Sequence, residues 1–301
     1  MTRPSFEHFL AIDWSGAKPA RAGAGHKGIA LALCGQGKAV PTLLPPPEGR
    51  HWTRVGVLDL LTHRLPPRTL VGMDLGIALP FADAGAFFPD LPGSPADARA
   101  LWAMIDALCA PDADLGATSF VDHPDLAPYF RRHGGREGAR FLLPGHGDRR
   151  GRMRVTERAQ ARMGCKPYSN FNLVGAAQVG KSSLTGMRLL HRLTGHLPVW
   201  PIDPLPGDGS VVVEIYTTLA AIEAGRSASR AKITDRAALD EALTALGAAP
   251  LGTAGPIDDH SADALITAAW LRRAAARQAL WHPPELTPEL AATEGWTFGA
   301  R

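Results

Sequence analysis

Residues 9–16 have the sequence FLAIDWSG, in which a short apolar run ends at Asp13 and passes into a turn. Such a run is typical of a buried β-strand, and the serine and glycine after it favour the turn. Residues 69–75, TLVGMDL, show the same pattern, with Asp74 near the end of a strand that is apolar enough to be covered on both faces. Carboxylates rarely stand unpaired in buried strands, so both aspartates require a positively charged partner.

Further strands and helices follow from the hydrophobic pattern. Three early strands followed by strand–helix units predict an α/β fold, with a mixed five-stranded sheet and helices on both faces. A purely parallel sheet would need a helix between the first strands, and none fits there. The remaining strands are predicted over residues 28–34, 39–44 and 211–216, and helices over residues 52–65, 97–109, 157–163, 184–193, 219–224, 235–246 and 259–280.

The chain has 301 residues, which allows one large domain or two smaller ones. The stretch 82–206 is less regular than its surroundings and ends in the proline-rich segment 198–206. We therefore expect residues 1–81 and 207–301 to form the core of the fold. Residues 82–206 would then be a long, Arg-rich insertion between the fourth and fifth strands.

Composition restricts the class of protein. Hydrophobic residues make up 45% of the chain and charged residues 20%, which supports a packed core, and the net charge of +3 is too small to identify an anionic partner. The three cysteines are far apart, which favours reduced thiols in a cytoplasmic protein. No signal peptide is expected, and no membrane partner, because no apolar run approaches the roughly 18 residues of a membrane span.

Acidic residues recur at the ends of the predicted strands and at the start of the last helix. Glu214 lies in the strand 211–216, and Asp263 lies in the first turns of the helix that begins near Asp259. Together with the aspartates of the first and fourth strands, they predict a site for Mg²⁺ or Mn²⁺, and a pair of such ions about 3.5–4 Å apart supports phosphodiester hydrolysis. Asp259 is either a further ligand or the N-terminal cap of the helix. For each carboxylate the alternative is a cap or a surface ion pair.

Four motifs in this order carry a resemblance to a known family. They are AIDWSG, GMDLGIALP, VVEIYTT and DDHSADALITAAW, and they resemble the domain of unknown function 429 family, which is regarded as a predicted ribonuclease H-fold nuclease family. The last motif is similar to the helix of RuvC-type Holliday-junction resolvases. The resemblance covers roughly residues 8–80 and 205–281, and the segments GAAQVGKSSLTGM and VWPID in the middle resemble one branch of the same family.

The resemblance implies roles for individual residues. Asp13 would be the metal ligand on the first strand, Asp74 the acidic residue on the fourth strand and Asp263 the carboxylate of the helix. His260 would be a helper or general base. Glu214 matches a Glu-hydrophobic-Tyr-Pro motif of the family, in which Thr217 of this chain replaces the proline.

The segment Gly175–Ser182, GAAQVGKS, fits the phosphate-loop pattern G-x-x-x-x-G-K-[ST]. In such a loop Lys181 would neutralise phosphates and Ser182 would bind Mg²⁺. Residues 171–174 are the candidate strand before the loop. A phosphate-loop domain needs several parallel strands after it, however, and only one convincing strand follows here. We therefore favour a chance match or a structural turn, and keep a nucleotide-binding protein as an alternative hypothesis.

The stretch 131–166 contains eleven Lys and Arg residues against three Asp and Glu residues. Basic side chains neutralise phosphates, and aromatic rings such as that of Tyr168 stack on exposed bases. The alternative is a solvated loop in a chain whose basic residues are mostly arginine. The candidate nucleic-acid contacts are Arg149, Arg150, Arg152, Arg154 and Lys181.

Our leading hypothesis is a metal-dependent nuclease of the ribonuclease H-like superfamily that acts on nucleic acid. It predicts that Asp13, Asp74 and Asp263 converge in space. The nucleotide-binding hypothesis predicts a strand–loop–helix arrangement around Gly175–Ser182. A third hypothesis, a nucleic-acid-binding module without catalysis, predicts affinity that survives Asp13→Asn and falls with salt.

Overall fold

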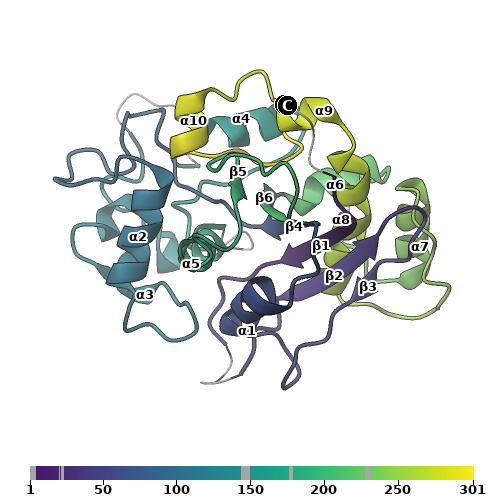
Figure 1. Cartoon of the computed structure of the whole chain (residues 1–301). Coiled ribbons are helices and arrows are strands. Elements are labelled where there is room, and N and C mark those ends of the chain that lie inside the picture. The colour runs from purple at the N-terminus through teal and green to yellow at the C-terminus, as the bar shows by residue number, and fades with distance from the viewer. Residues whose placement is uncertain (1–4, 20, 22–23, 144–149, 176–178, 228–231) are drawn as a thin grey trace.

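The computed structural model describes all residues except 1–4, 20, 22–23, 144–149, 176–178 and 228–231 (Figure 1). In this part of the chain, six strands form one mixed sheet in the order β3-β2-β1-β4-β6-β5. β1 pairs antiparallel with β2 and parallel with β4, and β6 lies parallel between β4 and β5. The strands are β1 (His8–Asp13), β2 (Ala30–Gly35), β3 (Thr42–Leu43), β4 (Thr69–Asp74), β5 (Val199–Trp200) and β6 (Val211–Ile215).

The mixed α/β sheet is confirmed, but its strand number differs from the expected five. The additional strand, β5, has two residues and stands between Pro198 and Pro201. A strand this short has no alternating pattern, and its proline-rich surroundings indicated a linker. The β3 strand is also shorter than predicted, with two residues in place of six.

Helices connect these strands, and several begin at a side-chain cap. Thr53, Asp97, Asp235 and Asp258 each accept a hydrogen bond from a backbone N–H of the following first turn, which stabilises the helix start. A π-helical turn (Leu60–Arg64) extends the first helix, and 3-10 turns cover Ala127–Tyr129 and His133–Gly135. The α-helices are α1 (Arg54–Asp59), α2 (Ala98–Leu108), α3 (Thr118–Asp122), α4 (Val155–Arg162), α5 (Val179–Arg192), α6 (Thr217–Glu223), α7 (Arg236–Ala245), α8 (Asp259–Ala275), α9 (Gln278–Trp281) and α10 (Pro288–Thr293).

The two faces of the sheet belong to two hydrophobic clusters. Because side chains alternate along a strand, Phe9 and Ala11 of β1 face one side and Leu10 and Ile12 the other. The first pair packs with α6, α7 and α8, on the right in Figure 1. The second pair packs with α2 and α5, on the left. Each face of the sheet is therefore covered by helices.

The stretch predicted as an insertion supplies one of these two layers. Both α2 and α5 lie within residues 82–206, and so does β5, which pairs with β6 at the edge of the sheet. Leu101 of α2 and Leu184 of α5 share a buried cluster with Leu10 and Val71 of the central strands. This stretch therefore packs as part of the same hydrophobic core. In the described residues, no helix has both the length and the apolar character needed to cross a membrane.

The loop after β1 is held directly against the start of α5. A Cβ atom on Gly16 would lie 2.2 Å from the carbonyl carbon of Lys181 and from the amide nitrogen of Ser182. Trp14, in the same loop, donates a hydrogen bond from Nε1 to the hydroxyl of Thr185 at 3.0 Å. The segment that follows Asp13 is thus fixed by backbone packing on α5.

We predict that Gly16→Ala destabilises the chain by about 1–3 kcal/mol, because two rigid backbones would have to separate. Urea unfolding followed by circular dichroism measures this change. The control is Gly207→Ala, since no atom lies within 4 Å of the added Cβ there. Equal stability of the two variants would contradict the close packing of the loop on α5.

Candidate active site at the ends of β1 and β4

Asp13 and Asp74 stand side by side at the carboxyl ends of two adjacent parallel strands. The register of β1 and β4 pairs Ile12 with Met73, so the next residue of each strand is one of these aspartates. Parallel neighbours in register point to the same face, and the strands lie about 4.8 Å apart. By the alternation along β1 and β4, this is the face covered by α8.

The start of α8 adds two further side chains. The Nδ1 atom of His260 lies 2.8 Å from a carboxylate oxygen of Asp13. Asp263 follows three residues after this histidine, and positions three apart on a helix share a face. The cap of α8 is Asp258, whose carboxylate accepts from the amide of Ser261, so the idea that Asp259 is the cap is wrong.

Electrostatics shows that the three aspartates influence one another. Burial, and then the charges of Asp13 and Asp263, raise the pKa of Asp74 well above its ordinary value. Burial and the charge of Asp13 raise the pKa of Asp263 to about 7. Burial also raises the pKa of Asp13, although the hydrogen bond and charge of His260 oppose it. The structure therefore brings together one buried carboxylate, that of Asp13, and two half-buried ones, those of Asp74 and Asp263, which repel one another when ionised.

Thr217 partly offsets this repulsion. Its hydroxyl donates to Asp74 at 3.4 Å, and its backbone N–H also lowers the pKa of that carboxyl group. Proline, the residue of the resembled family motif at this position, has no N–H to donate. The threonine thus supplies two donors to Asp74 that a proline would lack.

Asp259 adds negative charge near the aspartates, because it raises the pKa of Asp13 and of Asp263, but it has a counter-ion of its own. It forms an ion pair with Lys232 at the surface end of α8. Burial raises the pKa of Asp259, but the hydrogen bond and charge of Lys232 and the charge of His260 outweigh burial and lower it. A carboxylate already neutralised by lysine is a weaker candidate ligand than the other three.

Glu214 lines the same cleft as Asp74, but its carboxylate is already engaged by other groups. In the parallel register of β4 and β6, Glu214 pairs with Met73, the residue before Asp74. The side chains of Glu214 and Asp74 therefore point to opposite faces of the sheet, and Glu214 faces the side covered by α5. Its carboxylate accepts two hydrogen bonds from Arg154, one from the amide of Ile77 and one from the hydroxyl of Thr297. The four donors occupy the acceptor capacity of the group. The expectation that Glu214 is a metal ligand or catalytic residue is therefore wrong.

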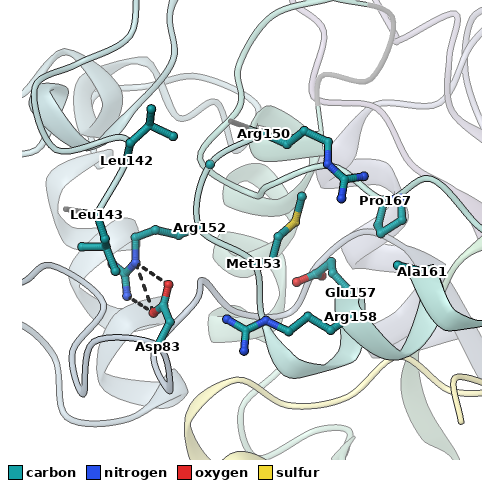
Figure 2. Close-up of a pocket in the computed structure, with 11 residues that line it drawn as sticks. Asp83, Leu142, Leu143, Arg150, Arg152, Met153, Glu157, Arg158, Ala161 and Pro167 are labelled. Atoms are coloured by element: carbon teal, nitrogen blue, oxygen red, sulfur yellow. Dashed lines mark hydrogen bonds and ion pairs between the residues drawn. The ribbon is translucent and has the colours of Figure 1, made fainter. Parts of the chain in front are cut away.

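Two of the predicted nucleic-acid contacts are buried instead. Arg154 bridges Glu157 and Glu214, and its side chain is almost inaccessible. Arg152 forms a buried ion pair with Asp83, which Figure 2 shows as dashed contacts in the wall of a small cavity. Neither guanidinium faces solvent, so both predictions are wrong. The sequence does not indicate the burial of Arg152 and Arg154, because charged side chains in a glycine-rich stretch are usually exposed.

The other predicted basic contacts lie elsewhere. Arg150 is exposed, and Figure 2 shows its guanidinium beside Pro167 at the mouth of the same cavity. Arg149 lies outside the described residues. Lys181 is half-buried in the first turn of α5 and lines two clefts next to the loop after β1.

A cleft of about 360 Å³ opens at the ends of β1, β4 and β6. Asp74, His260 and Tyr168 line it together with Asn170. The side-chain amide of Asn170 donates to the carbonyl oxygen of Ala78 at 2.8 Å, which orients it, and its Oδ1 atom is buried without a hydrogen-bond partner. A buried acceptor in this position is suited to a ligand that donates a hydrogen bond or carries positive charge.

The described residues contain no group of three or more His, Cys, Asp or Glu side chains already arranged to hold a metal ion. Mg²⁺ does not require such a group, because one or two carboxylates, waters and substrate phosphates commonly hold it. Three carboxylates, of which Asp74 shares the cleft with Asn170, offer oxygen ligands and excess negative charge. These residues therefore fit Mg²⁺ or Mn²⁺.

The phosphate-loop match lacks its strand. Residues 171–174 form no strand, and the pairing of Asn172 with Arg131 is an isolated bridge, so that prediction is wrong. The hydroxyl of Ser182 donates to the carbonyl of Val179 within the first turn of α5. Residues 176–178 of the loop lie outside the described part. No strand of the described sheet leads into Gly175–Ser182, which removes the structural context of nucleotide binding.

No model of a known protein family, no curated protein and no solved structure matches this chain. The chemistry of the site therefore has to be inferred from its own geometry. Three contributors were not predicted from sequence, namely Asn170, Lys232 and the side chain of Arg154 as an internal counter-ion. Asn170 lies in a polar loop without periodicity, and its proximity to β4 depends on the tertiary fold.

We predict that Asp263→Asn stabilises the chain at about pH 8, by about 1 kcal/mol or more, and that the gain shrinks toward about pH 4. The pKa of Asp263 rises on folding from 3.8 to about 7, so the folded state binds the proton more tightly than the unfolded state. Protonated Asp263 therefore stabilises the folded state at low pH, and this stabilisation is lost as the pH rises through the folded-state pKa of the residue. Urea unfolding at several pH values measures it. A difference independent of pH would contradict the raised pKa.

We predict that Glu214→Gln lowers the free energy of unfolding by about 3 kcal/mol, because Arg154 loses a buried counter-charge. Affinity of the remaining folded protein for Mn²⁺ should be unchanged. Urea unfolding and calorimetric titration of Mn²⁺ give the two readouts. A variant of unchanged stability that no longer binds Mn²⁺ would instead restore Glu214 as a ligand.

Proposed function

We propose that this chain is a metal-dependent phosphodiesterase of the ribonuclease H-like superfamily that acts on nucleic acid. The observation that carries the proposal is the convergence of Asp13, Asp74 and Asp263 on one face of the sheet, where burial raises the pKa of all three and the charge of Asp13 further raises those of Asp74 and Asp263. Three carboxylates that are costly to ionise together are suited to a divalent cation.

The sequence resemblance supports the same assignment. The family motifs put acidic residues on the first strand, on the fourth strand and on the last long helix. In this structure β1 and β4 are neighbours and α8 packs on both of them. Membership of the domain of unknown function 429 family is part of the proposal. We also place the protein in the cytoplasm, because its three cysteines are buried and unpaired.

The bound cation would be Mg²⁺ or Mn²⁺, held by Asp13, Asp74 and Asp263, and it would activate water and stabilise the leaving oxygen of a phosphodiester. His260 orients the carboxylate of Asp13 through its Nδ1 contact, and this contact raises the pKa of the histidine. His260 lines the cleft, so its imidazole is placed to hold a proton near the reacting phosphate.

We predict that Asp13→Asn abolishes both Mn²⁺ binding and metal-dependent cleavage of a mixed panel of labelled nucleic acids. The carboxylate is lost at the centre of the cluster while the shape of the side chain is kept. Calorimetric titration and gel analysis on the same samples measure the two effects. The matched control is Asp59→Asn, which removes an exposed carboxylate at the end of α1 that is paired with Arg64.

The outcomes separate the hypotheses. Loss of both properties in Asp13→Asn alone supports the proposal. Nucleic-acid affinity that is unaffected by Asp13→Asn, in a protein that cleaves nothing with Mg²⁺ or Mn²⁺, would overturn it in favour of a binding module without catalysis.

A further inference from the structure

Two lysines stand beside the acidic cleft on the far side of the loop that follows β1. Lys18 of that loop and Lys181 of α5 both line two adjoining clefts of about 950 and 520 Å³. The larger of these shares Gly16 and Ala17 with the cleft that contains Asp74. The acidic cleft and the lysine-lined clefts are therefore separated only by one loop.

Three of the four acidic side chains of the lysine-lined clefts have side-chain or backbone partners. Asp114 is paired with His26 at 2.6 Å, and Asp122 is paired with Arg132. Asp112 accepts two hydrogen bonds from Ser119. Glu137 is the remaining carboxylate in the lining, and the exposed Arg136 lies in the same wall.

Lys18 and Lys181, by contrast, make no ion pair among the residues that the structure describes. Burial is the main cause that lowers the pKa of Lys181, and the charge of the nearby Lys18 lowers it further. Two like charges held together without a counter-ion are unfavourable, and an anion between them removes the repulsion. Their position at a cleft wall leaves room for such an anion.

An exposed aromatic ring also belongs to the acidic cleft. Tyr168 is 45% exposed, which is unusual for a large apolar side chain in this fold, and it lines the same cleft as Asp74. An exposed ring beside a phosphate-binding surface is suited to stacking on a base. A base inside a duplex is already stacked and paired, so this contact selects an unpaired base.

We propose that the cleft binds single-stranded nucleic acid across the loop after β1, with phosphates at Lys18 and Lys181 and a base stacked on Tyr168. The phosphodiester between these contacts then lies over Asp74 and His260, which line the cleft. This inference deepens the proposed function and rests on it, since it names the substrate as a single strand.

The test is the binding of a labelled oligothymidylate of about 20 nucleotides, long enough to span the usual single-strand site. Fluorescence anisotropy is followed over a series of salt concentrations, with Ca²⁺ in place of Mg²⁺ to slow cleavage. The variants are Lys18→Ala/Lys181→Ala, Tyr168→Ala and Tyr168→Phe. A blunt duplex that contains the same strand is measured in parallel.

We predict that the double lysine variant weakens binding and reduces the slope of log affinity against log salt by about 1.4, or about 0.7 for each phosphate on a single strand. Tyr168→Ala should weaken binding about fivefold to a hundredfold, and Tyr168→Phe should keep it, because the ring does the stacking. The duplex should bind more weakly than the single strand.

The control for net charge is Lys38→Ala/Arg236→Ala, which removes two basic groups on the β2–β3 turn and on α7. Equal losses in this control and in the double lysine variant would overturn the inference, and so would a duplex that binds as tightly as the single strand. Displacement of the oligonucleotide by inorganic phosphate at equal concentration would also overturn it, in favour of a site for free phosphate.

Hydrolysis of bis(p-nitrophenyl) phosphate separates this inference from the proposed function. That small diester has one phosphate and no nucleobase, so it does not need the contacts with the lysines and with Tyr168. Its hydrolysis should be lost in Asp13→Asn and kept in Lys18→Ala/Lys181→Ala. If the double lysine variant binds the oligonucleotide normally while Asp13→Asn is inactive, the inferred path of the single strand is wrong and the proposed function still holds.

Discussion

The packing of α8 on β1 and β4 is the constraint on which the site depends. It brings the start of a helix over the carboxyl ends of two parallel strands, so that Asp263 and His260 meet Asp13 and Asp74. Burying three carboxylates together is unfavourable, and the hydrophobic contacts of α8 with the sheet must outweigh that repulsion. The site is thus a locally unfavourable cluster held in place by a favourable core, as is common where function requires charge in a buried position.

Much of the fold and half of the site could be predicted from the sequence. The strands that end in Asp13 and Asp74 are apolar and regular, and the last helix has a clear start, so these elements were predicted close to their observed bounds. The strand β5 was missed because two residues between prolines carry no periodicity. The start of α5 was predicted too late, since the first turn, VGKSS, lacks the apolar spacing that marks its later turns.

Strand register and helix packing decide which acidic and basic candidates lie in the site, and no local sequence pattern contains that information. Asp74 and Glu214 look alike in sequence, yet a difference of one residue in the register places them on opposite faces of the sheet. Arg154 lies 60 residues before Glu214, and its burial follows from the packing of α4 against the C-terminal segment. The basic stretch 131–166 therefore combines internal counter-ions with surface arginines, and composition alone cannot separate them.

The central claim is that Asp13, Asp74 and Asp263 hold one divalent cation between them. Anomalous diffraction from crystals soaked in Mn²⁺ tests it most directly, because the signal identifies the ion and its ligands at once. The account predicts an anomalous peak within coordination distance of the carboxylates of Asp13 and Asp74, with Asp263 bound directly or through water. A peak elsewhere, or three aspartates that remain free of metal at saturating Mn²⁺, would contradict it.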